Sequence, residues 1–484
     1  MKTSDCKTNS RPPSPHLSVG LPPLSQRLAF LRHLRHALCS ERDAILDDLA
    51  ALRPECSRGE LVSSELVPLL DTCAFLESQA QKILRPRKLG RNGQPVWLWG
   101  VHSTVYREPV GTVLILAPGN YPFFLPFAQS LHAWAAGNSV WLKSAPGSLG
   151  LHQRVRDIFR QAGGQESWLR LLGEDNSSYL PSLPQVQKVV LVGSAQTGRV
   201  VLSQAAEALV PSVAELSGWD TVFIHPDADM DLAAKSVAFG LSLNKGRTCV
   251  APRRILLRGS VEKFEEHFLK TMKNRGHTPL SPAERGQVKE MQAQGARPLW
   301  AHENHGPVLM SRVCVGNPLL QDEAFGALAV LRVVESDEEA LRIAHNCPYA
   351  LGASLLGPED WALELAHRVP AQVVSVNDVI VPTADPRVPF GGSGRSGYGR
   401  MRGAEGLLEM TQTRTVCVRR GGSLDHLLPP GPLDDLIVEK FMVMAHSKRA
   451  TRKLTALVQM ITGIFRERLR KRRNGESRPR LTIP

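Results

Sequence analysis

Apolar residues recur at three- and four-residue spacing between Leu24 and about Leu84. The repeating positions are Leu28, Leu31, Leu34, Ile45, Leu46, Leu49 and Leu52. This is the period of a helix with one buried face, so the pattern predicts two or three amphipathic helices. Residues 1–24 are instead rich in Pro and Ser, a composition typical of a disordered segment.

A second pattern begins at residue 112, where short β-branched apolar runs alternate with helical segments. Thr112–Ala117 suits a buried parallel strand, an apolar helix ends at Gly137, and a second strand follows over Ser139–Leu142. This order predicts a βαβ unit. Because ligands bind outside the carboxyl ends of such strands, Asn120 and Lys143 are candidate ligand-binding residues.

The same unit repeats at Val186–Val192, which the Gly-rich turn Gly193–Arg199 follows at the start of a helix. Backbone N–H groups in such a turn can approach an anion. Arg199 stands where a triphosphate-binding loop needs Lys, and no GxGxxG follows any strand. The pattern therefore predicts only a phosphate-bearing ligand.

A further α/β region extends from Glu215 to about Gly399. Its strands are expected near Thr221–Ile224, Arg254–Leu257, Ala329–Val334 and Val373–Val376. Five glycines within Pro389–Arg400 predict tight turns rather than a strand or helix. Upstream, the strand-like segment Val96–Pro109, with Gly100 near its middle, suggests a hairpin.

The length of 484 residues, 42% of them hydrophobic and 22% charged, is typical of a globular chain with two or three domains. No run reaches the ~18 apolar residues of a membrane-spanning helix, and the N-terminus lacks a secretory h-region. The eight cysteines form no CxxC pair, which favours a reducing compartment. We therefore predict a cytoplasmic protein. His33, His36 and Cys39 share a helical face without a fourth ligand, so no metal site is predicted.

The net charge of +13 is concentrated near the C-terminus. Between Ser447 and Arg480, twelve Lys or Arg stand against two Glu, so this segment carries +10 and the rest of the chain only about +3. The basicity thus says little about the body of the protein.

Two segments carry residue types suited to carbonyl chemistry. Asn244–Cys249 places a Cys in a loop beside Lys245 and Arg247, and nearby cations favour the reactive thiolate. Glu215 begins the turn Glu215–Gly218 and offers a carboxylate. Taken alone, each residue more often has a structural role. Such a Cys is usually a buried structural residue, and such a Glu is usually a helix cap or an ion-pair partner.

Six segments in order resemble the motifs of the aldehyde dehydrogenase superfamily. They are Pro118–Pro122, Ala135–Lys143, Val192–Gly198, Glu215–Gly218, Asn244–Cys249 and Glu323–Ala327. The resemblance covers about residues 25–420 and is closest to the class 3, fatty aldehyde dehydrogenase-like branch in its short N-terminus, in Val376–Val379 and in the PFGG segment at Pro389.

The resemblance implies an α/β fold with two open α/β domains. These are a Rossmann-like NAD(P)-binding domain over residues 25–214 and a catalytic domain over 215–402. A hairpin over 94–110 and a bridging strand over 403–420 would form a homodimer, and 421–484 would be a basic tail.

The resemblance also assigns roles. Cys249 would attack an aldehyde to give a thiohemiacetal and then a thioester, Asn120 would stabilise the oxyanion, and Glu215 would activate the hydrolytic water. The cofactor, NAD or NADP, would be held by Lys143, Gly193, Ser194, Gly198, Glu323 and Phe325.

Several positions depart from the family pattern. Gly119 replaces a Trp and enlarges the pocket near Asn120, Ser217 replaces a Gly beside Glu215, and Arg247 replaces a frequent Gln. Pro146 stands where a Glu often selects the 2′-hydroxyl of NAD, so NADP remains an alternative.

The leading hypothesis is NAD(P)-dependent oxidation of an aldehyde, long-chain or lipid-derived, to the carboxylic acid. One alternative is a coenzyme A-acylating dehydrogenase or acyl-thioester reductase, against which Glu215 argues because a thiol acceptor needs no water-activating base. Another is a non-catalytic scaffold, against which the presence of Cys249, Glu215 and Asn120 argues.

The tail combines an apolar stripe with basic borders. The stripe consists of Leu454, Leu457, Val458, Ile461, Ile464 and Phe465. This is the profile of a helix lying in an anionic membrane surface, so residues 447–480 predict peripheral contact with the cytosolic membrane face. The alternative is a tail that packs on its own oligomer and leaves a solvated basic end. An apolar stripe adds nothing to phosphate binding, which argues against nucleic acid.

Overall fold

The computed structural model describes residues 21–95, 98–273, 275, 278–302, 305–313, 326–420, 427, 429 and 431–473. Glu323, Phe325 and residues 1–20 lie outside the described residues. The chain divides into two units. The first is Met1–Arg85 with Arg107–Gln412, and the second is Pro86–Tyr106 with Thr413–Pro484.

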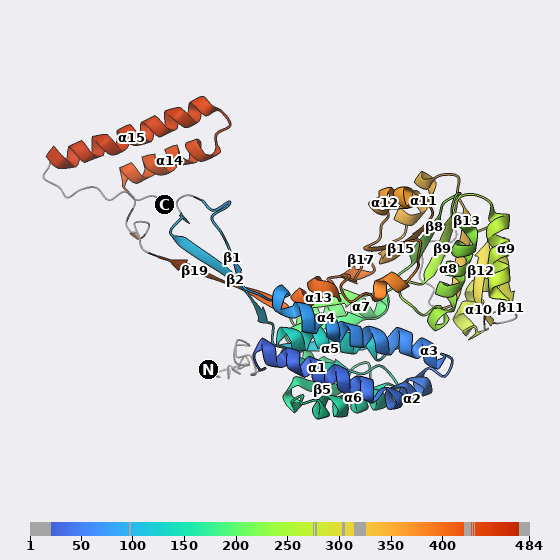
Figure 1. Ribbon diagram of the computed structural model, residues 1–484. Helices are drawn as coiled ribbons and strands as arrows, with labels where there is room; N and C mark the ends of the chain where they lie inside the picture. The colour runs from blue at the N-terminus through green and yellow to red at the C-terminus, as the bar shows by residue number, and fades with distance from the viewer. Residues whose placement is uncertain are drawn as a thin grey trace, which may run out of the picture. The chain divides into compact units, whose positions relative to one another are not determined.

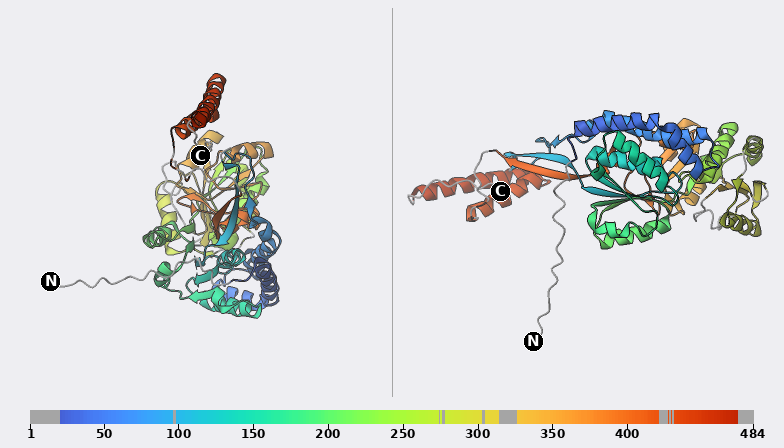
Figure 2. Two further views of the ribbon diagram at one scale, coloured as in Figure 1. Left: turned by 90° about the vertical axis from the view of Figure 1, so that its left-hand side faces the viewer. Right: turned by 90° about the horizontal axis from the view of Figure 1, so that it is seen from below.

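The N-terminal half of the first unit is a twisted sheet with helices on its faces (Figures 1 and 2). Its strands, in spatial order, are β18 (Gly397–Tyr398), β7 (Ser212–Glu215), β6 (Lys188–Val192), β3 (Thr112–Leu116), β4 (Ser139–Lys143) and β5 (Leu169–Leu172). All neighbouring strands are parallel except β18. Strand order reverses between β3 and β6, which is the switch point where ligands of such sheets bind.

The connecting helices are α5 (Phe124–Ala136), α6 (Leu149–Gln161) and α7 (Ala195–Glu207). Gly137, at φ 102°, ends α5 in the left-handed conformation that a Gly adopts without strain. The predicted strands and helices of this half therefore correspond to those observed.

A second sheet forms the rest of this unit. Its path is β10 (Thr278–Pro279), β12 (His305–Ser311), β13 (Leu328–Val333), β9 (Pro252–Leu257), β8 (Asp220–Ile224), β15 (Gly352–Leu356) and β16 (Val373–Val376), with β11 (Arg297–His302) paired to β12. On one face, α8 (Met230–Ser242) and α9 (Val261–Met272) bury Phe264 and Phe268. The remaining helices are α10 (Pro282–Ala293), α11 (Asp337–His345) and α12 (Glu359–Ala366).

The predicted N-terminal helices are α1 (Leu24–Ser40), α2 (Arg42–Leu52) and α4 (Val67–Ile83), with the short α3 (Arg58–Leu61) and a π-helical turn at Val62–Leu66 between the last two. Their apolar faces cover α5 and α6. Phe30 of α1 packs edge-on against Phe159 at 5.1 Å and Trp168 at 5.4 Å. The aromatic cluster ties α1 to the first sheet.

A buried ion pair joins these helices to the centre of the unit. Arg53, which ends α2, is 5% exposed and donates to Glu65, which is fully buried, over 2.9 Å. The second Glu65 oxygen accepts the backbone N–H groups of Phe123 and Phe124, at the start of α5, over 3.3 and 2.7 Å. One carboxylate thus fixes α5 to the N-terminal helices.

The second unit holds a three-stranded sheet and two helices. The sheet order is β1 (Arg87–Lys88), β2 (Val101–Pro109) and β19 (Thr411–Arg419). The helices α14 (Pro432–His446) and α15 (Ala450–Arg473) pack on each other and bury Ile437 and Ala456. Gly463 lets Leu436 approach, because a Cβ there would meet its Cδ2 at 2.3 Å.

Three details differ from the prediction. Within the predicted hairpin segment the observed strand begins only at Val101, after Gly100, and its antiparallel partner is β1. The predicted bridging strand is preceded by α13 (Gly403–Glu409). The Gly-rich segment contains the two-residue strands β17 (Ser393–Gly394) and β18, because Gly397 pairs with Glu215 at the edge of the first sheet.

We predict that Arg53→Met destabilises the protein by about 3–5 kcal/mol, because it leaves the Glu65 carboxylate buried without its cation. The shift of the urea unfolding midpoint measures this loss. Arg32→Met is the control, since Arg32 also pairs with a Glu but its side chain is 61% exposed, and such pairs contribute at most about 1 kcal/mol. Equal losses in the two variants would contradict the role assigned to Arg53.

Candidate active site

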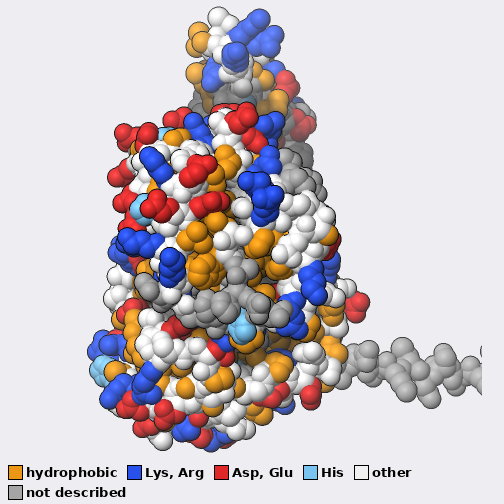
Figure 3. All heavy atoms as spheres, turned by 90° about the vertical axis from the view of Figure 1, so that its right-hand side faces the viewer, with side chains coloured by type: hydrophobic (Ala, Val, Ile, Leu, Met, Phe, Trp, Pro, Cys, Tyr) orange, Lys and Arg blue, Asp and Glu red, His pale blue; other side chains and the backbone are white. Residues whose placement is uncertain are grey.

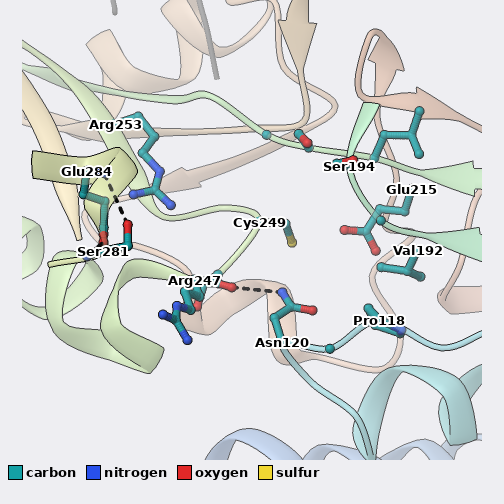
Figure 4. A pocket seen from close by; sticks show the side chains of 16 residues that line it. Pro118, Asn120, Val192, Ser194, Glu215, Arg247, Cys249, Arg253, Ser281 and Glu284 are labelled. Carbon is teal, nitrogen blue, oxygen red and sulfur yellow. Dashed lines mark hydrogen bonds between the residues drawn. The ribbon is translucent and has the colours of Figure 1, made fainter. Parts of the chain in front are cut away.

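Loops from the facing edges of the two sheets enclose a cavity of about 530 Å³. Cys249, Glu215 and Asn120 all line it, and Figure 4 shows the Cys249 sulfur and the Glu215 carboxylate facing each other. The structure thus brings together three residues that are far apart in the sequence.

Glu215 is the last residue of β7 and is only 1% exposed. Its backbone carbonyl accepts the Gly193 N–H over 3.1 Å, which fixes it beside the Gly193 turn. Burial raises the pKa of Glu215, whereas a hydrogen bond from the Cys249 thiol and the charge of Arg402 lower it. The Glu215 carboxylate is therefore a stronger base than an exposed one.

Cys249 follows a short 3-10 turn, Leu243–Gly246, that comes after α8. Burial and the adjacent Glu215 raise the pKa of the Cys249 thiol well above its ordinary value. This overturns the expectation that Lys245 and Arg247 favour the thiolate. Lys245 lies 4.0 Å from Glu55, and the Arg247 guanidinium turns away from the sulfur in Figure 4. Arg402 is the cation that lowers this pKa.

The backbone of Cys249 packs closely against the turn that follows Glu215. A Cβ at Gly218 would lie 2.2 Å from the Cys249 carbonyl oxygen, so only a Gly allows this approach. Ser217 accepts the Ala195 N–H on its hydroxyl over 3.3 Å and accepts the Ser396 hydroxyl on its carbonyl over 2.7 Å. The turn therefore links the nucleophile loop to α7.

Asn120 lies in the loop between β3 and α5. Its side-chain amide donates to the Arg247 carbonyl over 2.9 Å, and its side-chain oxygen accepts the Tyr121 N–H over 3.1 Å. One amide hydrogen is thus used to hold the nucleophile loop. The other is available to an oxyanion that forms near Cys249.

Strained backbone precedes the nucleophile. Asn244 and Lys245 have φ values of 48° and 53°, in the left-handed region that disfavours side chains. Three hydrogen bonds hold Asn244 there: its N–H donates to Glu60 over 2.7 Å, its side-chain oxygen accepts from Arg53 over 2.6 Å, and its amide donates to the Asn120 carbonyl over 3.0 Å. The Arg53–Glu65 pair therefore also positions the catalytic loop.

A second cavity, of about 440 Å³, adjoins the first and shares Pro118, Gly119, Val192 and Gly193 with it. Its lining includes Lys143, at the end of β4, and Pro146. Burial lowers the pKa of Lys143. The two cavities together occupy the switch point of the first sheet, where a dinucleotide is expected.

The turn at Gly193–Gly198 could hold a pyrophosphate there. Ser194 caps the start of α7 by accepting the Thr197 N–H over 3.1 Å. A Cβ at Gly198 would meet Leu216 at 2.7 Å, so Gly198 lets α7 pack beside β7. The exposed N–H groups at such a helix start attract anions. These residues fit the proposed cofactor, while Glu323 and Phe325 lie outside the described residues.

A third cavity, of about 210 Å³, is also lined by Cys249. It shares Glu215, Thr248 and Cys249 with the first cavity. Its other lining residues are Ser63, Ser64, Pro68, Tyr121, Phe124, Leu125, Phe239, Leu243, Val250, Ile380, Val381, Thr383, Ala384, Phe390 and Arg402. Cys249 is thus reached from two directions, and one side is mainly apolar.

Sequence reasoning missed the residues that support the site from a distance. Arg53 and Glu65 lie in the N-terminal helices, and Arg402 follows the Gly-rich segment. None of them stands in a motif or in a charge cluster that marks it. His33, His36 and Cys39 are exposed on α1, and no metal-binding cluster occurs among the described residues.

Comparison with known proteins identifies the family. The model of the aldehyde dehydrogenase family matches residues 18–416. A probable succinate-semialdehyde dehydrogenase [NADP(+)] of Synechocystis sp. is 31% identical over 82% of this chain and 90% of its own. A 4,4′-diapolycopene aldehyde oxidase of Methylomonas sp. is 29% identical over 80% and 77%. The chain therefore belongs to the aldehyde dehydrogenase family.

Solved structures agree with this assignment. A Mycobacterium tuberculosis aldehyde dehydrogenase complexed with NAD+ superposes with a TM-score of 0.75 at 22% identity, covering 83% of this chain and 87% of that one. The predicted α/β fold of the family is confirmed, and so is the prediction of an aldehyde dehydrogenase enzyme.

We predict that Gly218→Ala lowers aldehyde turnover at least about tenfold, because the added methyl displaces Cys249 and small misplacements of a nucleophile are costly. Initial rates of cofactor reduction measure the effect. Gly286→Ala is the control, since a Cβ there meets nothing within 4 Å. Normal turnover by Gly218→Ala would show that the close approach of the two loops is dispensable.

Proposed function

We propose that this protein oxidises an aldehyde to the carboxylic acid with NAD or NADP, through a thioester on Cys249. The observation that carries the proposal is the position of Cys249 and Glu215 at the junction of two cavities. One cavity continues to the switch point of the first sheet, and the other is apolar. A cofactor and an aldehyde can therefore reach the same sulfur from different cavities.

In the first half of the reaction, Cys249 adds to the aldehyde carbon. Glu215, whose carboxylate faces the sulfur, receives the thiol proton, and the carbonyl π electrons move to oxygen. The free amide hydrogen of Asn120 stabilises this oxyanion, and losing one such donor typically costs about 10²–10³ in rate. NAD or NADP, when bound, would accept the hydride that leaves the thiohemiacetal carbon.

In the second half, water cleaves the thioester. Glu215 first releases the thiol proton to solvent. It then takes a proton from the attacking water and returns it to the Cys249 sulfur, which leaves as the carboxylic acid forms. Burial raises the pKa of Glu215, which makes its carboxylate a stronger base. Glu215 favours hydrolysis over transfer to coenzyme A, and the intact set of Cys249, Glu215 and Asn120 argues against a non-catalytic scaffold.

The residues that would hold the cofactor are Lys143, Gly193, Ser194 and Gly198. Lys143 lies at the carboxyl end of β4 in the adjoining cavity, where it would hold ribose hydroxyls of the cofactor. No carboxylate lines the described part of this cavity, and Pro146 occupies the loop after Lys143. The absence of a repelling carboxylate there supports use of NADP as well as NAD.

The apolar cavity supports an apolar aldehyde as substrate. Phe124, Leu125, Phe239, Ile380 and Val381 surround the path to Cys249. The resemblance to the class 3 branch points to long-chain or lipid-derived aldehydes. Turnover of saturated aldehydes of increasing length, with NAD or NADP, tests this preference.

The Glu215→Gln variant separates the two half-reactions. We predict a slower burst of about one reduced cofactor per active site, followed by a stall. In acylation the thiol proton can pass to solvent in place of Glu215, whereas hydrolysis needs the Glu215 carboxylate as its base. Stopped-flow absorbance of the reduced cofactor measures it. Cys249→Ser is the control and gives neither burst nor turnover. Steady turnover of Glu215→Gln in water would remove Glu215 from the hydrolytic step.

We further propose that α14 and α15 lie on an anionic membrane surface at the cytosolic face. The exposed apolar side chains of α15 are Leu454, Val458, Ile461, Phe465 and Leu469, which follow one helical stripe. Arg452, Arg466 and Arg470 on the same helix are also exposed. On the face in Figure 3, by contrast, acidic and basic side chains are interspersed.

None of the described helices is long and apolar enough to cross a bilayer. An exposed stripe with basic neighbours can instead lie in the interface, where apolar burial and charge attraction add. We also propose that two copies of the chain form a homodimer through the β1-β2-β19 sheet. The outer strands of this sheet are where a strand of the second copy would pair.

We predict that the full-length protein sediments with phosphatidylserine-containing liposomes at low salt and less so at high salt, because the basic charge is screened. A truncation after Leu428 should stay in the supernatant and still oxidise a soluble aldehyde. Leu454→Glu with Phe465→Glu, which keeps the tail and breaks the stripe, serves as the matched variant. No liposome binding by the intact chain would end the membrane proposal.

A further inference from the structure

Arg402 is a buried cation without an anionic hydrogen-bond partner. It precedes α13 and is 5% exposed. Its guanidinium stacks over Phe390 at 4.3 Å and lies 5.8 Å from the Phe124 ring. Its side chain makes no hydrogen bond or ion pair with any residue that the structure describes. Burying a charge in this way is costly unless a compensating charge is near.

The compensating groups are the catalytic ones. Arg402 lines the 210 Å³ cavity together with Glu215 and Cys249. The other carboxylate whose charge acts on Arg402, Asp385, is already paired with Arg387 through two of its donor atoms. Glu215 and Cys249 act on Arg402 more strongly than Asp385 does, and both line its cavity.

We propose that Arg402 is a positioning residue whose positive charge holds one negative charge on the Cys249–Glu215 pair, so that Cys249 attacks the aldehyde as a thiolate. The three residues form a unit of one cation, one anion and one shared proton. The two cationic neighbours of Cys249 in the sequence do not supply this charge, because Lys245 faces Glu55 and Arg247 turns away.

The charges around the unit agree with this assignment. Arg402 lowers the pKa of both Cys249 and Glu215, and both of these groups raise the pKa of Arg402. Glu215 raises the pKa of Cys249, whereas Cys249 lowers that of Glu215. The other titratable or charged groups that face the unit are Tyr121, His132, Asp220 and Asp385. Asp220 is in turn faced by Arg253 and Arg254.

Two of these groups, His132 and Tyr121, do not supply a charge that acts on Cys249 and Glu215. Burial lowers the pKa of His132 to about 4, so it is neutral at pH 7. Burial raises the pKa of Tyr121 above its ordinary value, and its hydroxyl bonds to Thr248 over 2.6 Å. Arg402 is therefore the cation that acts on the described pair.

The step balances within the chain. The proton of the Cys249 thiol moves to a Glu215 oxygen, the sulfur lone pair forms the bond to the aldehyde carbon, and the carbonyl π pair goes to oxygen. No other reactant is needed before hydride loss. The inference rests on the proposed function for the identity of the electrophile, but the ionisation of Cys249 can be measured without any aldehyde.

The test is the pH dependence of Cys249 alkylation by iodoacetamide, followed by mass spectrometry of the Cys249 peptide between pH 5 and 10. Arg402→Met should move the curve to higher pH and slow alkylation at pH 7 about tenfold, since an opposite charge at this range shifts a pKa by one unit or more. Arg402→Lys should restore the rate to within about threefold. Arg395→Met, an exposed arginine of the same loop, is the control for charge loss alone.

If Arg402→Met does not fold, a second variant tests the proposed unit of Arg402, Cys249 and Glu215. Glu215→Gln removes the carboxylate and leaves Arg402 facing the sulfur, so the alkylation curve should move to lower pH. An unchanged curve in a folded Arg402→Met, or a shift to higher pH in Glu215→Gln, would overturn the inference. If Arg402→Met loses activity only toward aldehydes that carry a carboxylate, and its alkylation curve is unchanged, the inference is overturned and Arg402 is assigned to substrate binding.

Discussion

The Arg53–Glu65 pair is the interaction on which the architecture of the site depends. Removing two charges from water is expensive, and the cost is offset only where every remaining donor and acceptor is satisfied. Here Glu65 accepts from Arg53 and from two N–H groups at the start of α5, and Arg53 also bonds to Asn244. The N-terminal helices therefore help to shape the candidate site, since they hold both the Asn120 loop and the strained loop before Cys249.

Burial acts on the carboxylates of both places, and the neighbouring groups differ. Burial raises the pKa of Glu65 to about 7, against the charge of Arg53 and the N–H groups of Phe123 and Phe124. Burial also raises the pKa of Glu215 and of Cys249, and the cation that opposes it there is Arg402. Perturbed pKa values of this kind cluster at functional sites.

Much of the fold could be predicted from local patterns. The strands at residues 112–117, 139–142 and 186–192 follow from apolar runs between turn residues, and motif order identified the family. The electrostatics of the site could not be predicted, because Lys245 and Arg247 are near Cys249 in the chain while Arg402 is near it only in the fold. The left-handed backbone of Asn244 was equally hidden, since its cause lies in Arg53 and Glu60.

The junction at Cys249 has a consequence for how such an enzyme can diversify. The residues that define the apolar cavity, such as Phe239 and Val381, are absent from the lining of the cavity at the switch point, and Lys143 and Pro146 are absent from the apolar one. A mutation can therefore change the shape of one cavity without changing the lining of the other. Under the proposed function, substrate range and cofactor preference could then evolve independently, although both ligands meet at the Cys249 sulfur.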